Sequence, residues 1–373
     1  MLEKFVVTNF KNYQNRTEFD LGTHSNYEFN CEILKSNCLS KAIIYGINGS
    51  GKSNLGLAIF DIIFHLTDKE RVIAKYVPYL NMNSRKSIAE FEYYFTFNNM
   101  SVKYCYGKTD VNSLTYEKVF IDDQEVVSFD YTLNEGYTVL KGAEQLPLVI
   151  SNSVGESNKI SRVKYLKNNA LGLENNSVNQ AFIDFVRFVD NMLMFYSLDE
   201  KGYQGLLVGP DSYTQGIIRE KKVKDFEIFL REKGVDYELT VLNIGGVEEL
   251  YCKFIRGLVP FTAIASTGTR SLALFYYWYL KMSKASFVYI DEFDAFYHFH
   301  LAEVLVDLLK GLSNTQVVLS THNTDLMSND LLRPDAYYII QNNKISALDS
   351  LTDKEIRRAH NIQKMYRAGS FNE

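Results

Sequence analysis

The chain has 373 residues, of which 46% are hydrophobic and 23% are charged. This composition is typical of a folded protein of about two domains, and it excludes global disorder. A formal net charge of −5 excludes a strongly basic nucleic-acid binder, although it leaves room for a local basic patch. No apolar run approaches the roughly 18–20 residues of a membrane helix, and the N-terminus shows no secretion signal. The four cysteines lack CxxC spacing, so we expect a reduced, cytoplasmic protein without a membrane partner.

Strand patterns dominate the first 150 residues. Residues 4–7, 17–21 and 42–45 read as short strands, and residues 55–66 have helical spacing. A near-alternating pattern follows over residues 89–97, 102–106 and 114–121. The pairs Asn98-Asn99 and Asp122-Asp123 fit two-residue hairpin turns. This part of the chain therefore predicts an antiparallel β-meander next to a strand that leads into a helix.

The middle of the chain changes character. Residues 151–179 are polar, and two amphipathic stripes follow. The stripes consist of Phe182, Val186, Val189 and Leu193, and of Val223, Phe226, Phe229 and Leu230. Gly234 fits a helix C-terminus. Core packing explains both stripes, and neither is long enough for a coiled coil.

The last third returns to strand and helix alternation. Residues 287–290, 317–319 and 337–340 read as strands, with a helix over 301–309. Such alternation predicts a parallel sheet and an α/β fold. We therefore divide the chain into an N-terminal part (1–150), a mainly helical insertion (151–250) and a C-terminal part that returns to the fold of the first (251–373).

The strongest motif is a glycine-rich run between a predicted strand and a predicted helix. It matches GxxxxGK[ST], the phosphate-binding P-loop. Backbone N–H groups in such a loop turn toward one anion, and the helix N-terminus adds positive potential. We expect Lys52 to reach the β- and γ-phosphates of ATP and Ser53 to bind Mg²⁺. The candidate nucleotide contacts here are Gly46, Asn48, Gly49, Ser50, Gly51, Lys52, Ser53 and Asn54.

Two further polar groups follow predicted strands. Asp291 and Glu292 end the apolar run 287–290, which fits an Mg²⁺-holding aspartate and a glutamate that activates water. His322 ends the run 317–319, where its imidazole can lie beside a γ-phosphate. The other histidines fit surface or core positions, and no third ligand accompanies His298 and His300, so we expect no metal beyond Mg²⁺.

These three motifs in this order resemble the ABC-class ATPases. The resemblance implies a signature loop before the Asp-Glu strand, and the stretch Ser266, Thr267, Gly268 and Thr269 occupies that place. Its S-x-G-T form departs from the transporter form LSGGQ and is similar to that of SMC and RecF ATPases. In these families the signature loop contacts ATP held by the other subunit, so the resemblance implies a homodimer.

The start Thr8-Asn9-Phe10-Lys11-Asn12-Tyr13 also resembles RecF, SMC and OLD-type ATPases. It makes Lys11 a candidate phosphate or ribose contact, with a solvated turn lysine as the alternative. Asp294 and His298 are similar to the family pattern after the Asp-Glu pair, although Phe299 replaces its usual proline. No Q-loop glutamine is assigned.

The compact middle, with the Leu332–Tyr338 and Tyr366–Phe371 motifs, resembles the ATPases of bacterial abortive-infection systems, the AbiL-like and OLD-like group. This implies an ATPase that senses or gates in phage defence, with a toxin or nuclease effector on a partner protein. The stretch after His322 is too short for the nuclease domain of OLD proteins. The alternatives are a RecF-like DNA-repair ATPase and, third, a transporter energiser. Basic residues that could line DNA, or form a solvated face, are Lys159, Arg162, Lys164, Lys167, Lys221, Lys222 and Lys224.

Overall fold

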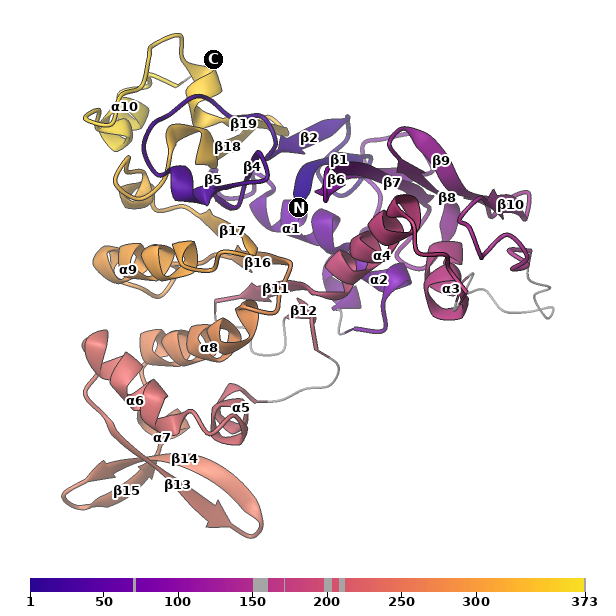
Figure 1. Ribbon diagram of the computed structural model, residues 1–373. Helices are drawn as coiled ribbons and strands as arrows, with labels where there is room; N and C mark the ends of the chain where they lie inside the picture. Colours follow the sequence, from indigo (N-terminus) through magenta and orange to yellow (C-terminus); the bar gives the residue numbers. More distant parts are fainter. Residues whose placement is uncertain (70–71, 150–159, 171, 198–202, 208–211, 372–373) are drawn as a thin grey trace.

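The protein is described here by a computed structural model. It describes residues 1–69, 72–149, 160–170, 172–197, 203–207 and 212–371. Within these residues two seven-stranded sheets form the body of the molecule, and two smaller sheets accompany them (Figure 1). No helix in the described part of the chain combines the length and apolar character needed to cross a membrane.

The first large sheet is antiparallel. Its order is β10-β9-β8-β7-β6-β1-β2. The strands are β1 (Leu2–Thr8), β2 (Thr17–Asp20), β6 (Ala89–Phe97), β7 (Met100–Lys108), β8 (Leu114–Ile121), β9 (Gln124–Asp130) and β10 (Glu135–Thr138). Asn98, Asn99, Asp122 and Asp123 all have positive φ, as the two-residue hairpin turn requires. The predicted meander is confirmed, and the N-terminal strand belongs to the same sheet.

The second large sheet holds the strands that bear the motifs. Its order is β12-β11-β16-β17-β5-β18-β19. The strands are β5 (Lys41–Tyr45), β11 (Met192–Tyr196), β12 (Gln204–Gly205), β16 (Phe287–Asp291), β17 (Gln316–Thr321), β18 (Tyr337–Gln341) and β19 (Lys344–Ala347). The five inner strands run parallel, whereas β12 and β19 are antiparallel edges. The inner strands are almost entirely buried, as expected for a sheet covered on both faces. The predicted α/β fold class is confirmed.

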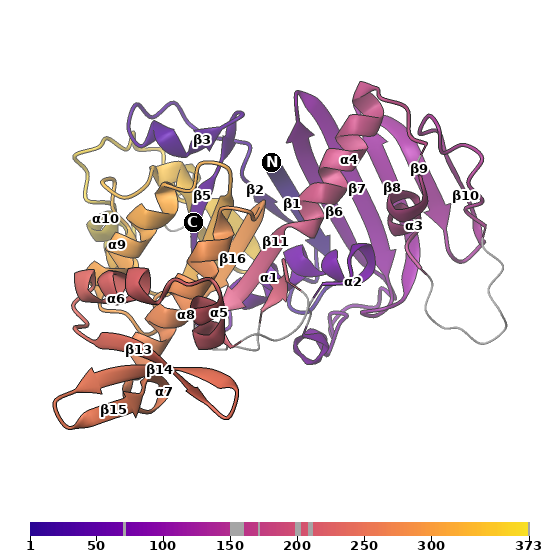
Figure 2. The same ribbon diagram turned by 60° about the horizontal axis from the view of Figure 1, so that its bottom comes forward.

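Helices cover both sheets. They are α1 (Lys52–Phe60), α2 (Ile63–Leu66), α3 (Arg162–Asn169), α4 (Ser177–Asp190), α8 (Thr267–Met282), α9 (Phe299–Lys310) and α10 (Ile362–Arg367). Figure 2 shows α4 lying across the meander, where Phe185 and Phe188 pack on Phe95. Short 3₁₀ turns are Cys31–Ile33, Ile73–Tyr76, Thr324–Leu326, Pro334–Ala336 and Leu348–Leu351, and β3 (Leu34–Lys35) pairs with β4 (Cys38–Leu39).

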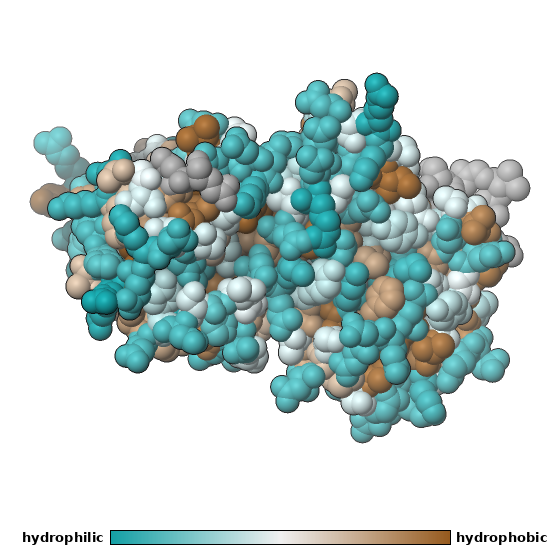
Figure 3. All heavy atoms as spheres, turned by 90° about the horizontal axis from the view of Figure 1, so that it is seen from above, coloured by the Kyte–Doolittle hydropathy of each residue, from teal (hydrophilic) through white to brown (hydrophobic). Residues whose placement is uncertain are grey.

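A small sheet stands at the lower end of the molecule in Figure 1. It consists of β13 (Glu238–Ile244), β14 (Val247–Phe254) and β15 (Gly257–Pro260), next to α5 (Tyr213–Arg219), α6 (Val223–Glu232) and α7 (Phe261–Ile264). Exposed apolar side chains lie at its turns and at the adjoining strand ends, including Ile244 and Ile255. By contrast, the face seen in Figure 3 is largely hydrophilic, with scattered apolar residues.

The middle of the chain differs in detail from the sequence pattern. The helix expected to reach Leu193 ends at Asp190, and Leu193 lies in β11, which pairs with β16 of the parallel sheet. The segment expected to be mainly helical also contributes β13 and β14. Gly234 has φ +85° just after α6, which fits the expected helix end. The three-part division of the chain stays a prediction.

Candidate functional site

The motif-bearing segments meet at one edge of the parallel sheet. β16, β17 and β5 are neighbours, and their carboxyl ends lead into Asp291-Glu292, His322 and the P-loop. The carboxyl edge of a parallel sheet is the usual ligand site of an open α/β fold. The candidate catalytic and phosphate-binding groups therefore come together although they are about 240 residues or more apart in sequence.

The P-loop joins β5 to α1 and needs its glycines. Gly49 and Gly51 have φ of +78° and +111°, which side chains rarely adopt. A Cβ atom on Gly46 would lie 2.3 Å from Ser50 Oγ and 3.0 Å from the Ile340 carbonyl oxygen, so a larger residue there would force the loop to shift. Gly51 is the N-cap of α1 and provides no side-chain hydrogen bond, which leaves the first N–H groups of the helix for an anion. Ser50 Oγ is a buried polar atom without a hydrogen-bond partner among the described residues.

Lys52 is the first residue of α1, and its side chain contacts this loop. Its Nζ donates to the carbonyl oxygens of Gly46 (2.8 Å) and Ile47 (3.3 Å) and lies 3.3 Å from His322 Nδ1. The residue is 5% exposed. Burial lowers the pKa of Lys52, and the charges of Asp291 and Glu292 oppose that shift. The lysine thus joins the P-loop directly to the segment after β17.

Asp291 and Glu292 are held by two serines, Ser320 in β17 and Ser197 directly after β11. Ser320 Oγ donates to Asp291 Oδ1 (2.5 Å) and accepts from the Glu292 backbone N–H (2.9 Å). Ser197, directly after β11, donates through its Oγ to the Glu292 carbonyl oxygen. Glu292 has φ +50°, an uncommon conformation for a residue with a side chain. These bonds hold the exposed glutamate at the strand end with its backbone restrained on both sides.

A third acidic residue belongs to the same cluster. Asp294 Oδ1 accepts from Thr321 Oγ1 at 2.5 Å. Together with Asn48, Glu292 and His322, these two residues line a pocket of about 410 Å³. His298, which the family pattern also suggested, lies at the N-terminus of α9, where its ring contacts Phe299. The pocket brings the P-loop, the Asp-Glu turn and the histidine to one surface.

The N-terminal motif supports the P-loop through residues to which the sequence assigned no role. Tyr13 OH donates to the carbonyl oxygen of Gly51 (2.9 Å), and Asn54 Nδ2 donates to Asn12 Oδ1 (2.7 Å). Lys11 Nζ instead donates to the Pro78 carbonyl oxygen at 3.3 Å. Burial lowers the pKa of Lys11. In the sequence, only their position in the N-terminal motif Thr8–Tyr13 could have indicated that Asn12 and Tyr13 contact the P-loop.

The Asp-Glu strand and the P-loop helix also touch directly. Tyr289 OH donates to the Lys52 carbonyl oxygen at 2.7 Å. A Cβ atom on Gly56 would lie 2.7 Å from the Tyr289 ring, so glycine permits this close approach of α1 to β16. Neither residue stood out in the sequence.

The signature-like stretch lies at the start of α8. Ser266 caps this helix, since its Oγ accepts from the Thr269 N–H at 3.1 Å. Thr267 is exposed, and a Cβ on Gly268 would lie 2.9 Å from the Phe296 carbonyl oxygen. In the described residues no hydrogen bond joins this stretch to the P-loop of the same chain.

The site offers oxygen atoms that suit a divalent cation. Ser53 lies in the first turn of α1, and Asp291 ends the neighbouring strand β16. A hydroxyl and a carboxylate are the protein ligands that Mg²⁺ takes beside phosphate oxygens and water. Across the described residues no group of three or more His, Cys, Asp and Glu side chains is arranged to hold a metal ion.

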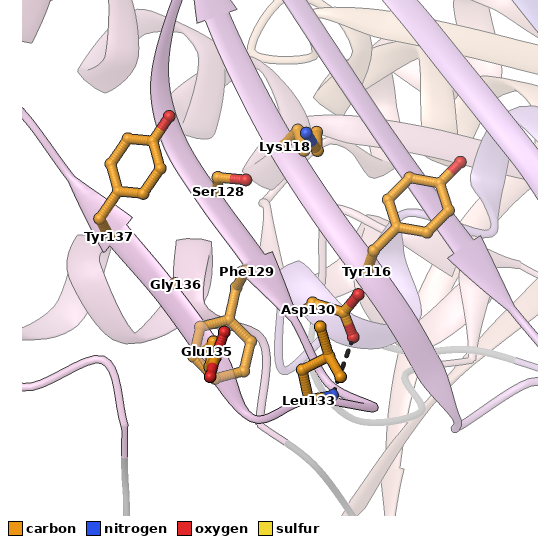
Figure 4. A pocket seen from close by; sticks show the side chains of 9 residues that line it. All are labelled: Tyr116, Lys118, Ser128, Phe129, Asp130, Leu133, Glu135, Gly136 and Tyr137. Atoms are coloured by element: carbon orange, nitrogen blue, oxygen red, sulfur yellow. Dashed lines mark hydrogen bonds between the residues drawn. The ribbon is translucent and has the colours of Figure 1, made fainter.

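A different hollow of about 650 Å³ lies on the meander, between β8, β9 and β10 (Figure 4). Two of its polar groups are already engaged: Lys118 pairs with Glu125 at 3.0 Å, and Tyr137 OH donates to the same carboxylate. It lies on the antiparallel sheet, away from the P-loop (Figure 1). It is therefore not part of the candidate site.

Comparison with known protein families matches residues 161–328. The matching family is described as "AAA domain, putative AbiEii toxin, Type IV TA system". This stretch is similar to an AAA domain. The match spans less than half of the chain and begins after the P-loop, but it includes Ser266–Thr269, Asp291, Glu292 and His322. No curated protein matches the chain.

Several solved structures are similar at low identity. An SMC head bound to the C-winged helix domain of ScpA is 13% identical, with a TM-score of 0.48 over 92% of this chain and 96% of that one. The SMC head domain from Thermotoga maritima is 15% identical, with a TM-score of 0.44 over 92% and 97%. The recombination mediator protein RecF is 13% identical, with a TM-score of 0.37 over 93% and 98%. All three TM-scores are below 0.5, so the architecture rests on the strand order described above.

Proposed function

We propose that the chain binds ATP with Mg²⁺ and hydrolyses it to ADP and phosphate. The observation that carries this proposal is the meeting of three strand ends, where Lys52 Nζ lies 3.3 Å from His322 in a P-loop next to Asp291 and Glu292. A chance P-loop match would not bring an aspartate, a glutamate and a histidine from two neighbouring strands to the same loop.

Each residue has a role that its position supports. Lys52 and the α1 N-terminus bind the β- and γ-phosphates, and Ser53 and Asp291 hold Mg²⁺. Glu292 accepts a proton from the attacking water, and the bonds from Ser320 and Ser197 keep its backbone in place. His322 contacts the γ-phosphate from the end of β17.

Lys52→Ala tests the binding step. Loss of the main cationic partner of the phosphates should abolish or severely weaken ATP affinity, measured by calorimetry with Mg·ATP. Lys35→Ala is the matched control, because Lys35 is an exposed lysine outside the site. Retained wild-type affinity in Lys52→Ala would refute the P-loop assignment.

We also propose that hydrolysis needs a homodimer, with Ser266, Thr267 and Gly268 completing the γ-phosphate site of the other subunit. Thr267→Asp is a suitable variant, because an acidic side chain at the first residue of α8 favours the helix but repels phosphate. Thr262→Asp, at an exposed position of α7, is its control.

Mixing the Lys52→Ala and Thr267→Asp proteins distinguishes shared sites from separate ones. Each variant alone should be inactive, whereas a mixed dimer holds one site with both changes and one intact site. Regained hydrolysis on mixing supports the shared site. Full activity of Thr267→Asp alone would indicate a monomeric enzyme.

For the cellular role, we propose a sensor or gate in bacterial anti-phage defence, with the effector on a separate protein. The description of the matched family supports this choice over DNA repair.

Most of the basic residues considered for DNA binding are not free to contact DNA, or fall where nothing is described. Lys159 lies outside the described residues, and Arg162 is buried. Four more of the basic residues considered for DNA binding, Lys164, Lys167, Lys222 and Lys224, form ion pairs with acidic side chains.

Phage infection provides the test of that role. Cells that express the chain with the product of the adjacent gene should give fewer plaques than cells with the Lys52→Ala variant. Equal plaque numbers would contradict the role in defence, and DNA binding by the purified chain would then favour the repair alternative.

A further inference from the structure

The C-terminal helix α10 contacts the loop that carries His322. Arg367 Nη2 donates to Thr324 Oγ1 and to Asp325 Oδ1, at 3.0 Å each. Gln363, one turn earlier on α10, donates through its Nε2 to the same oxygen of Asp325. Two side chains of one helix thus hold one carboxylate three residues beyond His322.

Hydrogen bonds within the loop connect residues 321–325 to one another. The Asn323 N–H donates to Thr321 Oγ1 (2.8 Å), and the Asp325 N–H donates to Asn323 Oδ1 (3.0 Å). Thr321 Oγ1 in turn donates to Asp294. His322 therefore lies between two anchored points: Thr321 at the end of β17 and Asp325 under α10.

The helix that provides this contact is anchored independently of it. Ile362, at the start of α10, is fully buried, and Phe371 just beyond its end is 2% exposed. The Ser370 N–H donates to the Met365 carbonyl oxygen (3.0 Å), and Gly369 has φ +77°, so the chain folds back on the helix. Loss of the Arg367 side chain should leave α10 in place.

We infer that α10 is a positioning element for hydrolysis, in which Gln363 and Arg367 hold Asp325 so that His322 stays beside Lys52. This inference rests on the proposed ATPase function. The side chains of Arg367 and Asp325 are 60% and 43% exposed, and an exposed ion pair adds little to global stability. Its effect should therefore appear in turnover rather than in unfolding.

Steady-state kinetics of Arg367→Ala and Gln363→Ala test this role. Loss of one such contact should lower kcat by roughly fivefold and leave the KM for ATP unchanged. Arg367→Lys keeps the charge and should recover part of the rate. Lys364→Ala is the matched control, since Lys364 is an exposed basic residue of the same helix. An unchanged kcat in Arg367→Ala would overturn the inference, as would an equal loss in Lys364→Ala.

A double-variant experiment tests whether Arg367 acts by positioning His322 or by a general effect on the enzyme. In a His322→Ala background, Arg367→Ala should cause no further fall in kcat, because both changes act through one group. If Arg367→Ala lowered kcat as much in the His322→Ala background as in the wild type, Arg367 would not act through His322.

Hydrogen–deuterium exchange gives a readout that needs no turnover. Exchange over residues 321–327 should be faster in Arg367→Ala than in Lys364→Ala, and equal exchange would overturn the contact that we infer. A wild-type chain that hydrolyses no ATP would disprove the proposed function, and the exchange result alone would then decide whether α10 holds the loop.

Discussion

The phenol of Tyr289, in the middle of β16, donates a 2.7 Å hydrogen bond to the carbonyl oxygen of Lys52, the first residue of α1. Both residues are buried, and burial raises the pKa of Tyr289 well above its ordinary value, so the phenol stays protonated. The strand that ends in Asp291 is therefore bonded to the helix that begins with the phosphate-binding lysine.

Tyr289→Phe removes this hydrogen bond without changing the ring. We expect the free energy of unfolding to fall by about 0.5–1.5 kcal/mol, measured by urea denaturation. ATP affinity should weaken modestly, because the first turn of α1 loses a support. Tyr279→Phe, at a partly exposed position of α8, is the control. Equal midpoints for Tyr289→Phe and wild type would show that the bond contributes nothing.

Glu292→Gln keeps the shape of the glutamate and removes its basicity. Hydrolysis should slow by about 10²–10⁴-fold while ATP still binds, because removal of a positioned base affects the chemical step. Single-turnover measurements of phosphate release, together with retained nucleotide, check this. Glu303→Gln on α9 is the control. Near-normal turnover in Glu292→Gln would place the base elsewhere.

A buried ion pair links the P-loop helix to the meander. Asp61, directly after α1, accepts from Lys108 Nζ (2.7 Å) and from the hydroxyls of Tyr106 and Tyr79 (2.9 Å each). Both charged side chains are 0% exposed. Asp61→Asn or Lys108→Met alone should each cost about 3–5 kcal/mol of unfolding free energy, because each leaves an unpaired buried charge.

The double variant should cost clearly less than the sum of the two single changes. Denaturant midpoints of all four proteins form the cycle. The exposed pair Lys253–Glu238 serves as the control, where the same cycle should show much weaker coupling than at Asp61 and Lys108. Strict additivity at Asp61 and Lys108 would mean that the pair is not coupled.

The burial of Lys41 should make the unfolding free energy depend on pH in the alkaline range. Its Nζ is buried at the start of β5 and donates to the carbonyl oxygens of Leu312 and Thr315. Burial lowers the pKa of Lys41 from 10.5 to about 8. Between those two values the unfolded chain binds more protons than the folded chain, so the unfolding free energy rises with pH by up to about 1.4 kcal/mol per unit.

Lys41→Met isolates this effect from other titrating groups. The difference in unfolding free energy between wild type and Lys41→Met should be flat below pH 8 and should rise between about pH 8 and 10 in favour of the wild type. Urea denaturation at several pH values measures it. A difference that stays flat, or falls, above pH 8 would contradict the lowered pKa.

Local patterns were sufficient to predict much of the fold. The turn pairs Asn98-Asn99 and Asp122-Asp123 define the meander because their residues tolerate positive φ. Apolar runs followed by polar residues located β5, β16 and β17, since buried parallel strands read as continuous hydrophobic stretches. These strands then placed the P-loop, Asp291, Glu292 and His322.

Other features depend on distant partners and left no local signal. Leu193 continues the helical stripe of α4, but pairing with Val288 draws it into β11. Asn12 and Tyr13 support the P-loop only because the N-terminal segment folds back on α1. The contact of α10 with Asp325 joins the Tyr366–Phe371 motif to the loop after His322, and neither stretch of sequence indicates that the other is its partner.

The position of β5 has a consequence for synthesis of the protein. β5 is made early, yet both of its neighbours in the sheet, β17 and β18, come from residues 316–341. During translation β5 therefore has no sheet partner until most of the chain has been made. The strands of the meander, by contrast, can pair as each one is synthesised. A nascent chain stalled before residue 316 should be protected from protease in the meander and sensitive around β5, and nucleotide binding should appear only as the last strands emerge.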